Sequence, residues 1–383
     1  MKTENQIHIS QYLTQEIEGS VIMPKSFNRT GVLPPPPVNE LCHSLNTPSL
    51  KIEWLAGDGS DRCYYRLHPS NSDSSLVLMQ LSGRDAVALE KGGYEWIELA
   101  KILQDYNILT PKVIATLPDY AAIIIEDYGN MMLSSLLQTE SGFNYEVAAK
   151  YQLAIDIIIN FLSINKNKKQ VWCSRSFDKE RFEWELDFFY QKFLAPIASL
   201  DLNKSQLKIF RQESQSLAAY LAKFSKYFVH RDFHSRNLMV SENNIAVIDF
   251  QDARLGPPSY DLVSLIFDSY VPIDNSDRLD LLEYAISSIR KKLPFATVQN
   301  NLITDEISNS WKPTLLQRQL KAIGSFGFLT LEKNRGDYLK YVKPALTTLI
   351  QNDIYDKRWP YISGELVENI MVNVDASIIG ALY

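Results

Sequence analysis

The stretch best equipped for chemistry lies at residues 229–252. VHRDFHSRNLMV holds two histidines, two arginines, an aspartate and an asparagine between apolar flanks, and IAVIDFQD follows after the short segment SENN. Charged groups seldom lie near a protein core unless they are paired. The stretch is therefore either a buried ionic network that only supports the fold or a site that carries out a reaction.

The same residues predict a β-hairpin. NLMV and IAVIDF are rich in apolar and β-branched residues, and SENN between them is turn-forming. Two registers, one residue apart, fit these continuous apolar runs, and the sequence favours neither. In both registers Asn237 and Asp249 end within one residue of each other, with Asp232 on the loop that leads in. We therefore expect three oxygen-bearing side chains to converge at the open end of the hairpin.

This convergence suits Mg²⁺-dependent phosphoryl transfer. Mg²⁺ prefers oxygen ligands, with one or two from the protein and the rest from water and phosphate. The reaction needs an aspartate that orients the attacking hydroxyl, and an asparagine with a second aspartate that hold the metal on the phosphates. The protein-kinase pattern H-R-D-x-x-x-x-N followed by D-F-G has these roles at this spacing. The matching residues are His230, Arg231, Asp232, Asn237, Asp249 and Phe250, with Gln251 in place of the glycine.

Two kinds of periodicity surround the motif and predict an α+β fold. Before Gly129, five short apolar or alternating runs predict strands, and one helix is expected over about residues 86–106; the runs are LKIEWLAG, RCYYRL, SLVLMQL, KVIATL and AAIIIED. After Gly129, helical periodicity dominates. The prolines of GVLPPPPVNE break any helix and predict an extended arm outside the core. We expect three regions: a Pro-rich arm (1–47), a small antiparallel lobe with one helix (48–128), and a larger helical lobe that carries the hairpin (129–383).

Composition limits the classes of function. A chain of 383 residues with 45% hydrophobic and 22% charged residues is typical of a globular protein with room for two lobes. The net charge of -6 argues against nucleic acid as the main partner. The three cysteines lack disulfide or metal-ligand spacing, which indicates reduced thiols, and neither a signal region nor a membrane-length apolar run is present. We expect a cytoplasmic monomer that binds a small-molecule substrate and does not associate with a membrane.

Several segments resemble the aminoglycoside phosphotransferase and choline kinase superfamily, above all VHRDFHSRNLMV together with IDFQDARLGPPSYDLVSL. Within it, IDFQDARLGPPSYDLVSL, DGSDRCYYRL and LQRQLKAIGSFGFL are similar to the branch of bacterial anomeric kinases for N-acetylmuramate and N-acetylglucosamine, which serve cell-wall recycling. The resemblance covers roughly residues 50–350. It implies a protein-kinase-like two-lobe fold, the cofactors ATP and Mg²⁺, and a sugar or amino-sugar acceptor.

The resemblance also implies roles for residues of the motif. Asp232 is expected to be the catalytic base, and Asn237 and Asp249 are expected to bind Mg²⁺. Asp261 is implied to steady the catalytic loop, but Ser259 and Asp261 could equally begin a helix, so Asp261 is given no catalytic role.

Four residues are candidate contacts for phosphate or acceptor. His234 takes the position where protein kinases carry a lysine near the transferring phosphate, and local packing is the alternative. Glu185 lies in an aromatic-rich helix and could bind sugar hydroxyls or an amine, unless it is simply solvated. Arg318 and Lys321 could meet an acidic acceptor such as the lactyl carboxylate of N-acetylmuramate, unless they lie on a surface helix.

The small lobe is expected to hold the nucleotide. Glycines in GDGSDR let backbone N–H groups approach phosphates, so the expected contacts are Gly57, Gly59, Ser60 and Arg62. The backbone from Glu126 to Tyr128 is expected to meet adenine at the hinge.

The strand SLVLMQL departs from the kinase pattern. It offers Met79 and Gln80 where a phosphate-binding lysine is expected, and Arg62, Arg66 or Arg84 could supply the missing charge.

Three other functions stay open on the sequence alone. An aminoglycoside- or choline-type kinase would have the same fold and motif. A pseudokinase would bind nucleotide without turnover, as the missing lysine allows. A metal-dependent hydrolase would use His230, His234, Asp232 and Asp249 as ligands of Zn²⁺ or Mn²⁺.

Overall fold

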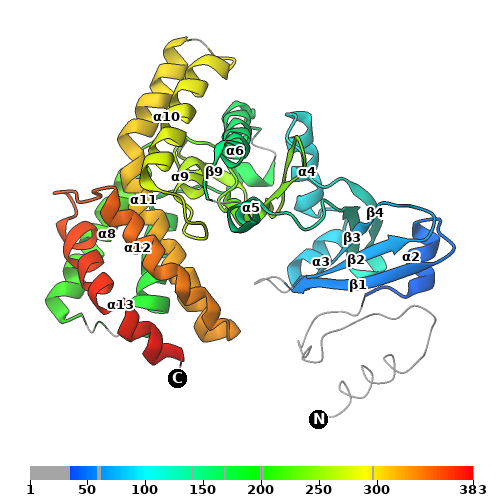
Figure 1. The fold of residues 1–383 in the computed structure, drawn as a ribbon, viewed down its shortest axis with the longest axis horizontal. Coiled ribbons are helices and arrows are strands. Elements are labelled where there is room, and N and C mark those ends of the chain that lie inside the picture. The colour runs from blue at the N-terminus through cyan, green and yellow to red at the C-terminus, as the bar shows by residue number, and fades with distance from the viewer. Residues whose placement is uncertain are drawn as a thin grey trace. The chain divides into compact units, whose positions relative to one another are not determined.

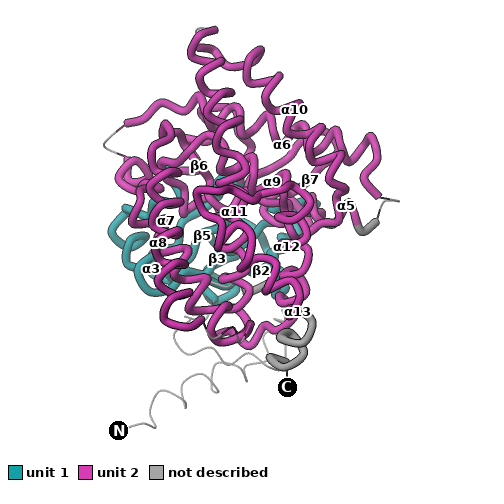
Figure 2. The backbone as a smooth tube through the Cα atoms, turned by 90° about the vertical axis from the view of Figure 1, so that its left-hand side faces the viewer, with its two compact units in different colours: residues 1–98, 111–127 teal, residues 99–110, 128–383 magenta. Residues whose placement is uncertain are grey.

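The computed structural model describes residues 35–57, 62–139, 142–167, 170–198, 200, 202–295 and 297–382. These residues form two compact units (Figure 2). The first comprises the chain up to Glu98 together with Pro111–Asp127, and the second comprises Leu99–Thr110 and the chain from Tyr128 onward. The division at Asp127 lies next to the boundary expected at residue 128, whereas Leu99–Thr110 groups with the second unit and not with the first.

The first unit is built on one antiparallel sheet of five strands in the order β1-β2-β3-β5-β4. The strands are β1 (Leu50–Gly57), β2 (Cys63–Pro69), β3 (Leu76–Gln80), β4 (Val113–Leu117) and β5 (Ala122–Glu126). All five coincide with the apolar or alternating runs of the sequence. The strand prediction for this unit is therefore confirmed.

A short helix near the start of the described chain packs against this sheet (Figure 1). Helix α2 (Val38–Ser44) buries Leu41 fully, in a core cluster that includes Ile52 and Leu67 of the sheet. Burying this leucine gains hydrophobic free energy that an arm in water would forgo. Part of the region expected to lie outside the core thus belongs to it, and residues 1–34 of the expected arm lie outside the described residues.

The single helix expected over residues 86–106 is two helices, which corrects the prediction. Helix α3 spans Gly83–Glu90 and helix α4 spans Glu95–Asp105. Gly92, just beyond α3, has a φ of 72°. This left-handed conformation ends a helix, and glycine adopts it without steric cost. Apolar residues continue on both sides of the break, so periodicity alone does not reveal it.

The second unit is mostly helical, as expected (Figure 1). Its α-helices beyond α4 are α5 (Leu133–Thr139), α6 (Tyr145–Ser163), α7 (Lys179–Phe189), α8 (Lys204–Leu221), α9 (Tyr260–Ile266), α10 (Asn275–Lys292), α11 (Thr297–Lys333), α12 (Val342–Gln351) and α13 (Leu366–Leu382). None of the helices in the described ranges is both long and apolar enough to cross a lipid bilayer.

Helix α11 packs closely against α7 and the turn that follows it. A Cβ atom on Gly324 would lie 2.8 Å from Phe189 Cα, and one on Gly327 would lie 2.1 Å from the carbonyl oxygen of Lys192. Only glycine fits at such distances. This approach lets Gln317 of α11 donate to the buried carboxylate of Glu185 on α7 at 2.9 Å.

Two short strand pairs carry the polar motif in the second unit. Strands β7 (Leu238–Val240) and β8 (Ile245–Val247) form the expected hairpin. Strands β6 (Tyr227–Val229) and β9 (Arg254–Gly256) form a second antiparallel pair. Three-residue strands are too short to show an alternating pattern, so the second pair could not be predicted from the sequence.

Candidate active site

The loop after β6 presents Asp232 in a constrained backbone. The Asp261 carboxylate accepts hydrogen bonds from the backbone N–H groups of His230 and Arg231, at 2.7 and 3.1 Å. Arg231 has a φ of 84°, a conformation that costs free energy for a residue with a side chain. Burial raises the pKa of Asp261 to about 7, against the effect of the two N–H groups. Asp261 therefore lies in the first turn of α9 and also holds the loop, which sequence reasoning left undecided.

The hairpin register brings the expected oxygen ligands together. Val240 pairs with Ile245, which selects one of the two registers, and the N–H of Ile248 then bonds to the carbonyl oxygen of Asn237. The Asn237 side-chain amide lies 3.4 Å from Asp249 Oδ2. Asn237 and Asp249 therefore lie side by side at the open end of the hairpin.

Hydrogen bonds orient these two side chains. The Asn237 amide nitrogen donates to the backbone carbonyl of Asp232 at 2.9 Å, which ties the hairpin to the loop. Gln251, in place of the glycine of the kinase pattern, donates its amide to Asp249 Oδ1 at 2.6 Å. Asp249 has a φ of 63°, again an unusual conformation for a residue with a side chain. One amide and one carboxylate suit a Mg²⁺ ion that takes its other ligands from water and phosphates.

The geometry does not support the hydrolase alternative. Across the described ranges, no three His, Cys, Asp or Glu residues lie close enough together to hold a metal ion. His230 is fully buried, and its Nε2 lies 3.0 Å from the carbonyl oxygen of Ile248. Burial lowers the pKa of His230 to about 4, against the opposing charge of Asp232. His230 is therefore a neutral part of the scaffold.

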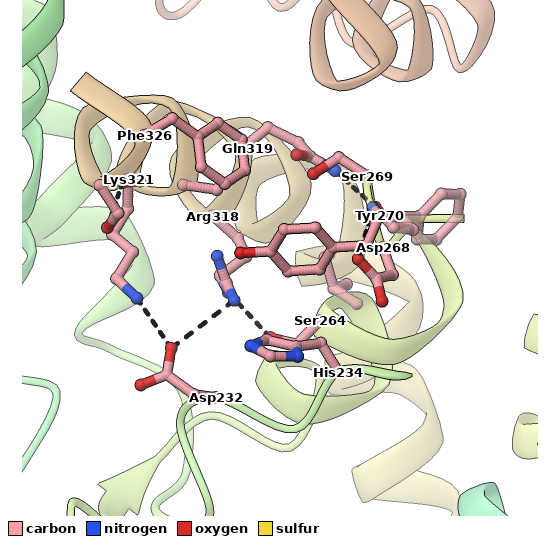
Figure 3. Close-up of a pocket in the computed structure, with 14 residues that line it drawn as sticks. Asp232, His234, Ser264, Asp268, Ser269, Tyr270, Arg318, Gln319, Lys321 and Phe326 are labelled. Atoms are coloured by element: carbon pink, nitrogen blue, oxygen red, sulfur yellow. Dashed lines mark hydrogen bonds and ion pairs between the residues drawn. The ribbon is translucent and has the colours of Figure 1, made fainter. Parts of the chain in front are cut away.

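Three cations surround the Asp232 carboxylate. Lys321 Nζ lies 2.8 Å from Asp232 Oδ1, and Arg318 Nη2 lies 3.7 Å from the same oxygen (Figure 3). Arg231 Nη1 lies 3.8 Å from Oδ2. Burial alone would raise the pKa of Asp232, but the charges of Lys321, Arg231 and Arg318 outweigh it and hold the pKa well below its usual range. Asp232 is thus a carboxylate throughout the neutral pH range.

A cavity of about 180 Å³ opens beside Asp232 within the second unit (Figure 3). Its polar lining comes from the loop after β6, from α9 and the segment that follows it, and from α11, and its aromatic lining includes Tyr270 and Phe326. The lining residues are Asp232, His234, Val263, Ser264, Phe267, Asp268, Ser269, Tyr270, Arg318, Gln319, Lys321, Ala322, Ser325 and Phe326. Three predicted contacts, His234, Arg318 and Lys321, therefore share one cavity with the predicted base.

Arg318 and Lys321 are buried, so the surface-helix alternative for α11 is wrong. Lys321 is held by Asp232, and Arg318 Nε donates to Ser264 Oγ at 3.0 Å. The sequence carried an unused signal for this, because QRQLK stands between the apolar stretches TLL and AIGSFGFL of the same helix. Asp268 and Tyr270 gave no comparable signal.

His234 and Glu185 differ in their access to the cavity. His234 packs edge-on against Tyr270, with ring centroids 5.1 Å apart, and burial lowers its pKa to about 4. Its imidazole is therefore neutral near pH 7. Glu185 is fully buried between Gln317 and Arg181 and is not part of the cavity lining. The alternative that Glu185 is solvated is therefore wrong. Glu185 also does not face the cavity.

The predicted nucleotide residues of the first unit fall into two groups. Gly59 and Ser60 lie outside the described residues, and Gly57 ends β1. Arg62 precedes β2 and pairs with Asp85 of α3, through Nε at 3.1 Å and Nη2 at 2.6 Å. It adjoins the pair formed by Cys63 and Gln80, the position where a lysine is missing.

The other candidates for the missing charge are less well placed. Arg66 bonds twice to Asp127, at 2.5 and 3.1 Å, so its charge is committed to the fold. Gln80 is buried and donates to the carbonyl oxygen of Tyr120 at 2.6 Å. Arg84 is exposed at the start of α3.

The segment expected at the hinge begins at the end of β5. Glu126 is the last residue of that strand, and its carboxylate accepts the backbone N–H of Lys112 at 3.2 Å. Tyr128 is the first residue of the second unit after β5.

Residues 51–293 match the model of the phosphotransferase enzyme family. Two curated relatives are both called N-acetylmuramate/N-acetylglucosamine kinase. The one from Neisseria meningitidis serogroup B is 27% identical over 288 residues, which cover 75% of this chain and 81% of the relative. The one from Pseudomonas aeruginosa is 25% identical over 292 residues, which cover 76% of this chain and 80% of the relative.

Solved structures with the same fold include two small-molecule kinases. An ADP-bound aminoglycoside phosphotransferase aligns with a TM-score of 0.53 and 18% identity over 81% of this chain and 96% of that chain. A Plasmodium vivax ethanolamine kinase aligns with a TM-score of 0.52 and 14% identity over 80% of this chain and 83% of that chain. At these identities the likeness establishes the fold. The expected kinase-like α+β fold is therefore confirmed.

Proposed function

Because the chain belongs to the phosphotransferase enzyme family, we propose that it uses ATP and Mg²⁺ to phosphorylate the anomeric hydroxyl of N-acetylmuramate or N-acetylglucosamine. That it is an enzyme transferring phosphate to a hydroxyl group follows from its family and its kinase relatives. The proposal adds the nucleotide, the metal and the acceptor.

The observation that carries the proposal is the position of Asp232 on the wall of a cavity that also contains Lys321 and Arg318. A hydroxyl group of a small molecule in this cavity reaches the carboxylate directly. Two cations at the same wall favour an acceptor with a negative charge, because charge-assisted hydrogen bonds are roughly twice as strong as neutral ones. N-acetylmuramate carries a lactyl carboxylate, and the names of the relatives support this acceptor.

Asp232 has the role of orienting the acceptor hydroxyl and accepting its proton. Its low pKa makes it a weak base, which is adequate because the transition state of phosphoryl transfer is largely dissociative and the proton leaves late. An anomeric hydroxyl is more acidic than an ordinary alcohol and suits such a base. Lys321 and Arg318 also oppose the negative charge that spreads over the transferring phosphoryl group.

Asn237 and Asp249 would hold Mg²⁺. The fit rests on their proximity and on the orientation of both side chains, with the amide nitrogen of Asn237 bound to the Asp232 carbonyl and Asp249 bound to Gln251. The ion would neutralise charge on the phosphates, which is what it supplies in phosphoryl transfer.

In the first unit, Arg62 is the proposed replacement for the missing lysine. Its pairing with Asp85 of helix α3 fixes a guanidinium beside the strand position of Gln80. Gly57, Gly59 and Ser60 are proposed to contribute backbone N–H groups to the phosphates, and the backbone from Glu126 to Tyr128 is proposed to bind adenine.

A panel of acceptors tests the proposal. The protein is incubated with ATP, Mg²⁺ and either N-acetylmuramate, N-acetylglucosamine, an aminoglycoside or choline, and the product is identified by phosphorus NMR. We expect an anomeric phosphate from the two sugars, with a higher kcat/KM for N-acetylmuramate that Arg318→Gln reduces. Transfer to the 6-hydroxyl, or only to the aminoglycoside or choline, would contradict the acceptor. ATP binding without turnover on any acceptor would identify a pseudokinase.

A further inference from the structure

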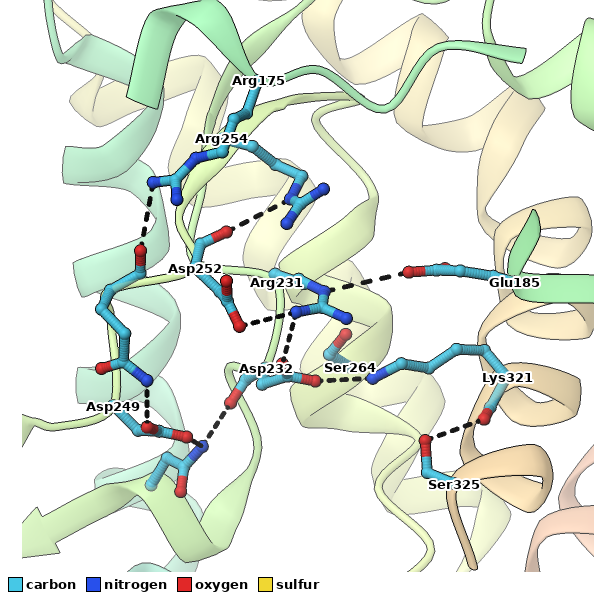
Figure 4. Close-up of polar contacts among 12 residues, drawn as sticks. Arg175, Glu185, Arg231, Asp232, Asp249, Asp252, Arg254, Ser264, Lys321 and Ser325 are labelled. Carbon is cyan, nitrogen blue, oxygen red and sulfur yellow. Dashed lines mark hydrogen bonds and ion pairs between the residues drawn. The ribbon is translucent and has the colours of Figure 1, made fainter. Parts of the chain in front are cut away.

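A second group of charged residues lies beside the catalytic loop, away from the cavity lining (Figure 4). We define the arginine cluster as Arg181, Arg231 and Arg254, together with the carboxylates of Glu185 and Asp252. Arg231 Nη1 lies 2.8 Å from Asp252 and its Nε lies 3.8 Å from Glu185. Arg181 Nη2 lies 3.4 Å from Glu185. The cluster thus holds three guanidinium groups but two carboxylates, both of which are bound by Arg181 or Arg231.

Arg254 is the guanidinium of this cluster without a carboxylate. It is only 7% exposed, and its contacts are the backbone carbonyl of Asp252, 3.2 Å from Nε, and the ring of Phe177, 5.2 Å away. Within the described ranges no carboxylate forms an ion pair with it. Burial and the like charges of Arg231 and Arg181 lower the pKa of Arg254 to about 10. A buried cation repelled by two others is costly unless an anion joins it.

The contact of Arg231 with Asp232 does not add a carboxylate to the arginine cluster. Arg231 Nη1 lies 3.8 Å from Asp232 Oδ2, but Asp232 is bound more closely by Lys321 at 2.8 Å. The backbone of Arg231 also has a φ of 84°, a conformation that glycine adopts without strain and a residue with a side chain does not. Backbone strain of this kind persists where the surrounding structure holds the residue in place, and it concentrates at functional sites.

The cluster is open to solvent on one side. The side chain of Asp252 is 50% exposed and that of Arg181 is 25% exposed, whereas Glu185 is fully buried. An anion that enters from this side meets the partly exposed Arg181 before the buried Arg254, and it competes with Asp252 for Arg231. Arginine is well suited to such a ligand, because its planar donors bind phosphate and carboxylate in pairs.

We propose that Arg181, Arg231 and Arg254 form an oxyanion site that binds a phosphate group, separate from the acceptor cavity. The missing carboxylate at Arg254 and the excess of three guanidinium groups over two carboxylates carry this assignment. The phosphate group comes either from free inorganic phosphate or from a phosphate ester. This site does not depend on the identity of the acceptor sugar.

Calorimetric titration of the whole protein with inorganic phosphate tests the proposal, in buffer of constant ionic strength without nucleotide. We expect saturable binding that weakens about 10-fold or more in Arg254→Gln, the scale of one lost charged hydrogen bond. Arg211→Gln, on an exposed position of α8, is the matched control and should keep the wild-type affinity. Arg318→Gln reports phosphate that binds in the acceptor cavity instead. A parallel titration with glucose 1-phosphate separates the two sources: equal affinity indicates an ester site, and weaker affinity indicates a site for the free anion.

Asp252→Asn is a second test, and unlike Arg254→Gln it leaves every arginine of the cluster in place. This change removes the carboxylate that competes for Arg231, so phosphate should bind several-fold more tightly. A misfolded protein cannot produce such a gain. The proposal is overturned if wild-type protein shows no saturable binding, if Arg318→Gln loses the binding while Arg254→Gln keeps it, or if Asp252→Asn binds phosphate no better than wild type.

Discussion

Lys321 Nζ lies 2.8 Å from Asp232 Oδ1, although 89 residues separate the two in the chain. The kinase pattern that Asp232 belongs to ends at Phe250, whereas Lys321 comes from the middle of α11. A cation supplied by another element therefore sets the charge state of the predicted base. Arg318, one turn earlier on the same helix, adds to this effect at 3.7 Å.

Asp232→Asn should lower kcat by ~10² to 10⁴-fold, the usual contribution of a general base. The affinity for nucleotide should hardly change, because the substitution removes a proton acceptor and leaves the side chain's size intact. Steady-state kinetics and nucleotide titration measure the two quantities. Asp280→Asn, on an exposed position of α10, is the control. Normal turnover in Asp232→Asn would make Asp232 a structural residue.

Lys321→Met should move the acid limb of the kcat/KM profile to higher pH. In wild type the cations hold the pKa of Asp232 well below 3.8, so activity should not fall on account of Asp232 as pH is lowered from 8 to 5. Removing Lys321 removes a charge that lowers this pKa, while burial still raises it. The pKa therefore rises, and Asp232 becomes protonated at a higher pH.

The control for this profile is Lys291→Met, which removes an exposed lysine of α10. Its acid limb should coincide with that of wild type. If Lys321→Met lowers kcat equally at every pH, Lys321 acts on the substrate alone and does not set the pKa of Asp232.

Asp249→Ala should abolish phosphate transfer. The phosphates would lose a metal ligand, and the charge that develops in the transition state would lose its counterion. A second measurement is nucleotide affinity at increasing Mg²⁺ concentration, which should rise in wild type and stay flat in the variant. Full activity in the variant, or in wild type with excess chelator, would remove the metal assignment.

Gly327→Ala should destabilise the protein by about 1–3 kcal/mol, the usual cost of overpacking. The added Cβ would lie 2.1 Å from the carbonyl oxygen of Lys192, a backbone atom that cannot rotate away. Urea unfolding measures the change. Gly93→Ala is the matched control, because the nearest atom to its Cβ would be 3.9 Å away. Equal stability of the two variants would show that α11 can shift away from the turn that follows α7.

Local patterns determined the five strands of the first unit and the hairpin with Asp232, Asn237 and Asp249. In both cases the signal lies within one strand or between neighbouring strands, where side chains repeat every second residue and turns have characteristic residues. The break at Gly92 escaped this kind of reasoning. Apolar spacing continues through it, and only the backbone conformation shows that one helix has ended.

The sequence could not choose the hairpin register or the partners of Asp232. The register is set by which residues pair across the turn, here Val240 with Ile245, and continuous apolar runs fit two pairings equally well. Lys321 reaches Asp232 because α11 packs beside the loop after β6. Arg254 bonds to a backbone carbonyl and to no carboxylate because of the residues that the fold places around it. Such contacts join segments that are distant in the chain, so their geometry is decided by the packing of whole elements and not by the spacing of residues within one.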